Sequence, residues 1–263
     1  MHSALLSGMI EACEKAGDFQ LEHFRSVTAD SVSDKGLNQL VSFVDVESEK
    51  MLVVSLKKLR PDAGFITEEN TAPNDSESHA VWIIDPLDGT TNFLHGLQVF
   101  SISIALMENS IVTAGVVYAP AMKEMFCAEK NRGAYLNNNA IRISDTSCLR
   151  ESLIATGFPY YEFQQTRAYL DLLGELMKST HGLRRLGSAA IDLAYTACGR
   201  FDGFYETGLN AWDVAAGALL VAEAGGVVSD FHQIQNHLFG KQIVAANPAV
   251  YEELQPLTLS YLG

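Results

Sequence analysis

Two carboxylates lie three residues apart where the chain is otherwise strongly apolar. Asp85 follows the run Ala-Val-Trp-Ile-Ile, Pro86 comes next, and Asp88-Gly89 begins a tight turn. This order predicts that the strand ends at Asp85, and it places two carboxylates and the Leu87 carbonyl around one point. Like charges this close raise each other's pKa unless a cation lies between them. Oxygen-only ligands suit a hard cation, Mg²⁺ first and Mn²⁺ or Ca²⁺ next.

Basic residues are missing around these acids. Between Arg60 and Lys123 the chain has no Lys or Arg, and it holds a Glu68-Glu69 pair after another apolar run. A second stretch without bases, between Arg200 and Lys241, contains Asp213 at the start of an apolar helix. A turn with a helix cap, or an acid favoured by a helix dipole, is the alternative explanation for each acid alone. The shared lack of bases favours a metal site.

The residues after the turn favour a phosphate ligand. Thr90-Thr91-Asn92 is typical of a helix start. The free amides of such a start could cradle a phosphate beside the metals.

Hydrophobic spacing predicts the elements that position these residues. Helices are expected over residues 6–24 and 38–59, the second ending before Pro61. Short β-branched runs then predict strands: 64–67, 80–85, 99–107, 111–119 and 124–129. Beyond them strands and helices alternate: strands near 153–155, 183–186, 203–205, 227–228 and 243–245, and helices near 161–178, 189–198 and 212–223. We expect one unit over residues 1–263, with an α+β half to about residue 145 and an α/β half from about residue 146.

Composition narrows the class of protein. The 263 residues are 48% hydrophobic and carry a formal net charge of −14. That balance gives no indication of nucleic-acid binding, which normally needs a basic face. No secretory leader and no membrane-spanning run is evident, and the four cysteines are scattered. We expect a cytoplasmic protein with free thiols.

Three motifs together resemble a known family. GFITEE (64–69), WIIDPLDGTTNF (82–93) and WDVAAG (212–217) with EAGG (223–226) are similar to motifs of the inositol monophosphatase family. Its members are Mg²⁺-dependent, lithium-sensitive phosphatases related to fructose-1,6-bisphosphatase. The resemblance covers essentially the whole chain. It implies a layered αβαβα sandwich, commonly a homodimer.

The resemblance assigns a metal role to five residues. Glu68, Asp85 and the Leu87 carbonyl would hold one Mg²⁺, and Asp85, Asp88 and Asp213 a second. Glu68 would help to hold a weaker third ion. Mn²⁺ is a possible substitute, and Li⁺ an expected inhibitor.

Catalytic and substrate residues follow in the same way. Asp45, Thr90 and Glu68 would be catalytic, with Asp45 bonded to Thr90 so that both help to activate a water molecule. Lys35 matches the lysine of a mobile loop, although a solvated loop residue is the alternative. The implied substrate contacts are Asp88, Gly89, Thr90, Thr91, Gly187, Ser188, Ala189, Glu206 and Asp213. Glu206 would bind sugar hydroxyls, or would instead pair with Arg184 or Arg185.

The implied reaction is hydrolysis of a phosphorylated polyol, myo-inositol monophosphate first, by in-line attack of a metal-activated water. Related alternatives are fructose 1,6-bisphosphate, histidinol phosphate and 3′-phosphoadenosine 5′-phosphate. A regulatory binding protein on the same fold is a further alternative, and the complete set of acids argues against it.

Overall fold

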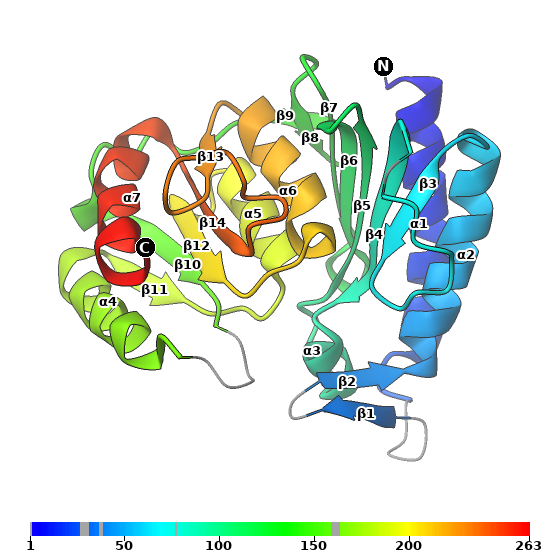
Figure 1. The fold of residues 1–263 in the computed structure, drawn as a ribbon, viewed down its shortest axis with the longest axis horizontal. Helices are drawn as coiled ribbons and strands as arrows, with labels where there is room; N and C mark the ends of the chain where they lie inside the picture. Colours follow the sequence, from blue (N-terminus) through cyan, green and yellow to red (C-terminus); the bar gives the residue numbers. More distant parts are fainter. Residues whose placement is uncertain (1, 27–31, 37–38, 77, 159–163) are drawn as a thin grey trace.

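Helices and sheets alternate in five layers (Figure 1). The computed structural model describes residues 2–26, 32–36, 39–76, 78–158 and 164–263, with backbone only for 32–36 and 39–42. The outer layers are α1 (Ala4–His23) with α2 (Phe43–Leu59), and α4 (Thr166–Ser179) with α7 (Pro248–Leu262). The middle layer is α5 (Ala189–Ala197) with α6 (Ala211–Glu223). A sheet lies on each side of this layer, which confirms the αβαβα sandwich.

A seven-stranded sheet lies between α1–α2 and the middle layer. Its order is β3-β4-β5-β6-β7-β8-β9, and only β3 and β4 pair in parallel. The strands are β3 (Gly64–Thr67), β4 (Ala80–Asp88), β5 (Ser101–Glu108), β6 (Ile111–Ala119), β7 (Glu124–Glu129), β8 (Ala134–Leu136) and β9 (Asn139–Ile141). Because β3 and β4 are parallel, their carboxyl ends meet at the same edge of the sheet.

The second sheet has five strands in the order β11-β10-β12-β14-β13. Strand β10 pairs in parallel with β11 and β12, whereas β14 pairs antiparallel with β12 and β13. The strands are β10 (Leu153–Thr156), β11 (Gly182–Arg184), β12 (Gly203–Thr207), β13 (Val227–Ser229) and β14 (Gln242–Ala246). A separate hairpin pairs β1 (Val32–Gly36) with β2 (Gln39–Ser42), and α3 (Thr90–Leu94) follows β4.

Several elements differ from the sequence expectations, and β1, β8 and β9 were not predicted. The helix expected from residue 38 begins at Phe43, because residues 39–42 pair as β2. The helix expected from residue 161 begins at Thr166. Strand β4 does not end at Asp85 but continues through Pro86, where a one-residue bulge removes the need for an N–H in the ladder. Helix α7 was not predicted, and Pro256 lies inside it.

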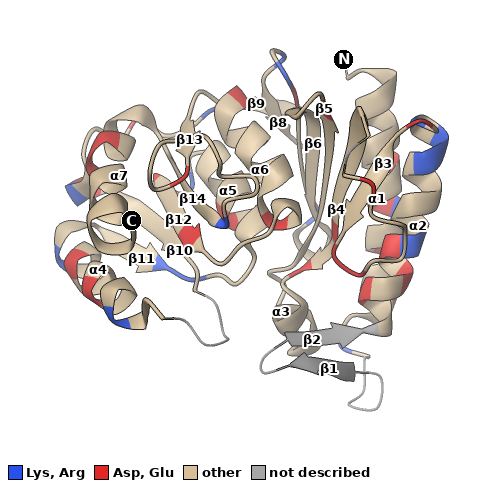
Figure 2. Cartoon of the chain, in the orientation of Figure 1, with Lys and Arg blue, Asp and Glu red and all other residues tan. Residues whose placement is uncertain are grey.

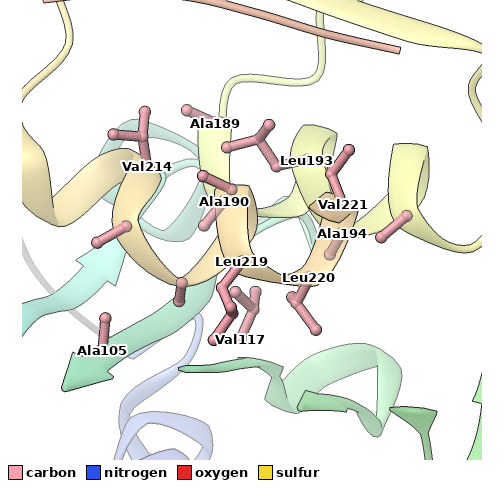
Figure 3. Close-up of a cluster of buried hydrophobic side chains, with 14 of the residues drawn as sticks. Ala105, Val117, Ala189, Ala190, Leu193, Ala194, Val214, Leu219, Leu220 and Val221 are labelled. Carbon is pink, nitrogen blue, oxygen red and sulfur yellow. The ribbon is translucent and has the colours of Figure 1, made fainter. Parts of the chain in front are cut away.

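Small residues let the middle layer pack closely. Figure 3 shows Ala190 and Ala194 of α5 lying against α6, and Leu219 of α6 beside Val117 of the sheet. A Cβ placed on Gly217 of α6 would lie only 2.5 Å from the Leu193 Cβ. Glycine therefore sets the spacing of the two helices whose first turns enter the site described below.

Replacing this glycine tests that spacing. We expect Gly217→Ala to lower the free energy of unfolding by about 1–3 kcal/mol, because a packed core resists added volume. Gly174→Ala on α4 is the matched control, since nothing lies within 4 Å of a Cβ there. Alanine has a higher helix propensity than glycine, so this control should stabilise the protein by about 0.5–1 kcal/mol. Urea unfolding of both variants checks this, and equal effects would contradict it.

Candidate active site

Two acids come together where β3 and β4 end. Asp85 is 2% exposed, and its Oδ1 accepts the Leu87 N–H at 2.9 Å. Glu68 follows β3, and its N–H donates to the Ile84 carbonyl of β4 at 3.3 Å. The parallel pairing of the two strands therefore brings Glu68 beside Asp85, although seventeen positions separate them in the chain.

The β4 bulge directs Asp88 across to the middle layer. Its Oδ2 accepts the Ser188 hydroxyl at 2.6 Å and the Ala190 N–H at 2.8 Å. Ser188 is the N-cap of α5 and also accepts the Ile191 N–H. The Asp88 carboxylate thus lies at the N-terminus of α5, where the helix dipole favours negative charge.

Asp213 enters from the first turn of α6. Its Oδ2 accepts the Asn210 N–H at 2.6 Å, and Asn210 caps the helix in return. Asp213 therefore does act as an acid at a helix start, the alternative given for it above, and it also lies beside the other acids of the site. We name Glu68, Asp85, Asp88 and Asp213 the acidic cluster.

Burial raises the pKa values of all four acids, and repulsion by neighbouring carboxylates adds to the rise for Glu68, Asp85 and Asp213. Burial raises the pKa of Asp88 to about 6. Burial and then the Asp88 charge raise the pKa of Asp213 to about 7. The pKa values of Glu68 and Asp85 rise well above their usual range, through burial first and then through Asp213 for Glu68 and Glu68 for Asp85.

The chemistry of the acidic cluster suits divalent cations, because the four acids lack ion-pair partners among the described residues that would balance their charge. Among the ion pairs formed by described residues, none includes one of the four acids. Figure 2 shows Lys and Arg positions mainly on outer helices such as α2 and α4 and on outer loops, and also at the end of β11. Arg185, the residue after β11, lowers the pKa of Asp88 without overcoming the effect of burial. Within the described ranges, no group of three or more His, Cys, Asp or Glu side chains is close enough together to hold a metal ion as the side chains stand. The acids instead interact in pairs, and a hard cation would relieve their repulsion.

Thr90 lies beside the acidic cluster with two possible acceptors. Its hydroxyl is 2.9 Å from Asp45 Oδ1 and 3.0 Å from the Leu87 carbonyl. Asp45 belongs to the first turn of α2 and is 1% exposed. A hydroxyl has one proton, so Thr90 donates fully to only one of these oxygens at a time.

Gly89 is a glycine because of both its conformation and its neighbours. Its φ is +93°, in the left-handed region. A Cβ there would lie 2.9 Å from the Val99 carbonyl oxygen. The turn between Asp88 and Thr90 therefore depends on the absence of a side chain.

Glu206 lies on β12 and is 9% exposed. Its pKa rises to about 8 because burial outweighs the opposing effect of Arg185, and the Asp213 and Asp88 charges add to the rise. Arg184, the other partner considered, donates from Nη1 to the Leu183 carbonyl.

The remaining expected contacts differ in accessibility. Thr91 is exposed, whereas Ser188 and Ala189 are buried, and Gly187 has a left-handed φ of +91°. Lys35 lies in β1, and its side chain is outside the described residues.

Asp192, in the first turn of α5, is a further buried acid near the site. It is 1% exposed and its Oδ1 has no hydrogen-bond partner among the described residues. Burial, Glu206 and Asp88 raise its pKa well above the usual range.

Sequence reasoning missed three side chains that hold the loops of the site. Gln20 donates to the Pro86 carbonyl at 2.7 Å, and Asn92 donates to the Val99 and Leu186 carbonyls. Glu49 accepts the N–H groups of Glu69 and Thr71 after β3. For Gln20 and Glu49, a polar residue on the buried face of a helix was the available signal.

Comparisons with known proteins agree with this fold and site. A suhB extragenic suppressor protein from Bartonella henselae superposes with a TM-score of 0.92 at 41% identity, over 97% of this chain and 98% of that one. The Thermotoga maritima IMPase gives 0.86 at 35% identity, over 96% of each chain. Both have the layered sandwich described above.

Sequence comparison places the chain more closely. The sequence profile of the inositol monophosphatase family matches residues 1–262. Inositol-1-monophosphatase of Mesorhizobium japonicum is 44% identical over 96% of this chain and 95% of its own length. The Nus factor SuhB of Escherichia coli K12 is 40% identical over 95% and 94%. The chain therefore belongs to the inositol monophosphatase family, a family of phosphatases that are generally metal-dependent.

The variant Asp88→Asn tests the repulsion. Both hydrogen bonds fall on Oδ2, so an amide oxygen can keep them. The pKa of Asp88 rises from its ordinary value of 3.8 to about 6 in the folded protein, so ionisation of Asp88 lowers the free energy of unfolding as the pH rises through this range. We expect the metal-free variant to match the wild type near pH 4 and to exceed it at pH 7 by on the order of 1–3 kcal/mol.

Thermal unfolding at both pH values, with and without Mg²⁺, measures this effect. Mg²⁺ should stabilise the wild type more than Asp88→Asn, because the variant has one fewer anionic ligand. Asp18→Asn, at an exposed position of α1, should change neither result. A metal-free Asp88→Asn protein that is less stable than the wild type at pH 7 would contradict the repulsion.

Proposed function

We propose that the protein hydrolyses a small phosphorylated polyol, myo-inositol monophosphate first, with Mg²⁺ as its cofactor. The observation that carries this proposal is the acidic cluster: four carboxylates, one just after β3, two on β4 and one on α6, none of them in an ion pair with a described residue. Family membership supports the phosphatase class.

Five residues would hold the cations. Glu68, Asp85 and the Leu87 carbonyl would hold one ion and Asp85, Asp88 and Asp213 another, with Glu68 assisting at a third. Bound Mg²⁺ or Mn²⁺ would supply positive charge against the phosphoryl oxygens and lower the pKa of water. Li⁺ is the expected inhibitor.

Thr90 and Asp45 would accept the proton of the attacking water. The Thr90 hydroxyl lies 2.9 Å from Asp45 Oδ1. As an attacking water gives a proton to Thr90 Oγ1, the Thr90 proton can pass to Asp45. Glu68, beside Asp85, would help to orient that water. The backbone amides of Gly89 and Thr90 would bind phosphate oxygens, because the left-handed Gly89 leaves this turn free of side-chain bulk.

Residues of the second half would select the alcohol part of the substrate. Glu206 would accept hydrogen bonds from ring hydroxyls, next to the 187–189 segment. Thr91 and Lys35 are proposed as further contacts. Ser188 and Ala189 are buried beside Asp88. Their burial supports a role in positioning Asp88 rather than direct contact with the substrate.

Phosphate release tests the proposal. Inositol 1-phosphate is compared with fructose 1,6-bisphosphate, histidinol phosphate and 3′-phosphoadenosine 5′-phosphate, at saturating Mg²⁺ and with or without Li⁺. We expect the inositol ester to give the highest kcat/KM and Li⁺ to suppress it. Preference for another ester would keep the reaction and change the substrate, whereas no release from any of them would contradict the proposal.

A role as a Nus factor is the second candidate, and the 40% identity to Escherichia coli SuhB favours it. The variant Asp88→Asn separates the two roles, because it should lose turnover and keep the fold. Rescue of an Escherichia coli strain lacking SuhB by both forms would support a role independent of catalysis. Rescue by the wild type alone would tie the role to the phosphatase reaction.

The assembly is proposed as a cytoplasmic homodimer in which residues 1–263 form one unit. The packing of α5 and α6 against both sheets supports a single unit. No helix among the described residues is long and apolar enough to cross a bilayer. Light scattering after gel filtration tests the dimer.

Glu206→Ala tests how the alcohol part is recognised. We expect kcat/KM for inositol 1-phosphate to fall about ten-fold or more, and that for p-nitrophenyl phosphate to change less than about three-fold. The reason is that an aryl ester has no ring hydroxyls for Glu206 to bind. Glu252→Ala, at an exposed acid of α7, serves as the control. Equal losses on both esters would remove Glu206 from substrate recognition.

A further inference from the structure

The Glu206 carboxyl lies directly against the backbone of Gly157. Gly157 follows β10, which pairs in parallel with β12, and the register Thr156↔Tyr205 places Gly157 beside Glu206. A Cβ built on Gly157 would overlap both Glu206 carboxyl oxygens and their carbon. No residue with a side chain fits there while Glu206 keeps its position.

Backbone conformation does not explain this glycine. Gly157 is not among the glycines with positive φ, whereas Gly187 and Gly208 are. An L-residue could therefore adopt its backbone conformation, and the space that Glu206 occupies is what excludes a side chain.

Groups from neighbouring segments surround Glu206. Both Gly157 and Glu206 are buried, and β12 lies between β10 and β14. The Arg185 guanidinium stacks on the Phe158 ring, 4.9 Å from its centroid, next to Gly157 in the chain. The positive charge of Arg185 also lowers the pKa of Glu206, although burial has the larger, opposite effect. The wall around the acid is therefore built from three separate segments.

We propose that Gly157 is a specificity-determining position, because its missing side chain seats the Glu206 carboxyl where it can bind the hydroxyls of a phosphorylated polyol. The proposal rests on the proposed function of Glu206. Gly157 is a positioning residue that acts through Glu206 and touches neither phosphate nor metal. A side chain at position 157 would displace the acid and weaken polyol recognition selectively.

Gly157→Ala provides the first test. The kcat/KM for inositol 1-phosphate should fall about ten-fold, mainly through a higher KM, and that for p-nitrophenyl phosphate should stay within about three-fold. Gly174→Ala, the same change in open space on α4, should alter neither ester.

Two further variants separate positioning from general damage. In Gly157→Ala/Glu206→Asp, an acid that is shorter by one methylene makes room for the new methyl, and selectivity for the polyol ester should partly return. In a Glu206→Ala background, Gly157→Ala should cost nothing further on the polyol ester. A merely structural role would give additive losses and no rescue.

Several results would overturn the proposal. They are equal losses on both esters, a full Gly157→Ala effect without Glu206, or a crystal structure of Gly157→Ala in which Glu206 has not moved. If Glu206→Ala itself fails to discriminate the esters, the proposed role of Glu206 has failed first, and the role of Gly157 fails with it. If Glu206→Ala discriminates and Gly157→Ala does not, only the inference about Gly157 fails.

Discussion

Repulsion among four carboxylates is the constraint on which the rest of this structure depends. Neighbouring carboxylates add to the raised pKa values of Glu68, Asp85 and Asp213, burial raises the pKa of Asp88, and none of the four forms an ion pair with a described residue. Left to themselves, such groups would separate or take up protons. The surrounding fold must therefore hold them in place against this repulsion, and bound cations would neutralise them.

The middle layer of helices supplies much of that restraint. Asp88 accepts hydrogen bonds at the start of α5, and Asp213 lies in the first turn of α6, so two helix N-termini favour the two charges. Close packing at Gly217 and Leu193 fixes the distance between these helices. Because α5 and α6 also contact both sheets, the site joins the two halves of the chain. We infer that the halves unfold together.

Much of this arrangement was predictable from short segments. The acids of 64–69, 82–93 and 212–217 could be identified because each motif combines its carboxylates with the apolar strand or helix that positions them. The layered fold followed from the family resemblance and is confirmed. Local pattern failed at Pro86, where a bulge lets the strand continue, and at residues 39–42, whose pairing in β2 overrides a helical pattern. It also could not reveal that Gly157 faces Glu206 or that Glu49 holds the loop after β3, because these contacts join residues far apart in sequence.

Anomalous diffraction from crystals soaked in Mn²⁺ would test the central claim most directly. The account predicts at least two strong peaks, one between Glu68, Asp85 and the Leu87 carbonyl and one between Asp85, Asp88 and Asp213, with the second weakened or lost in Asp88→Asn. The absence of peaks among these oxygens, or peaks only elsewhere on the molecule, would contradict it.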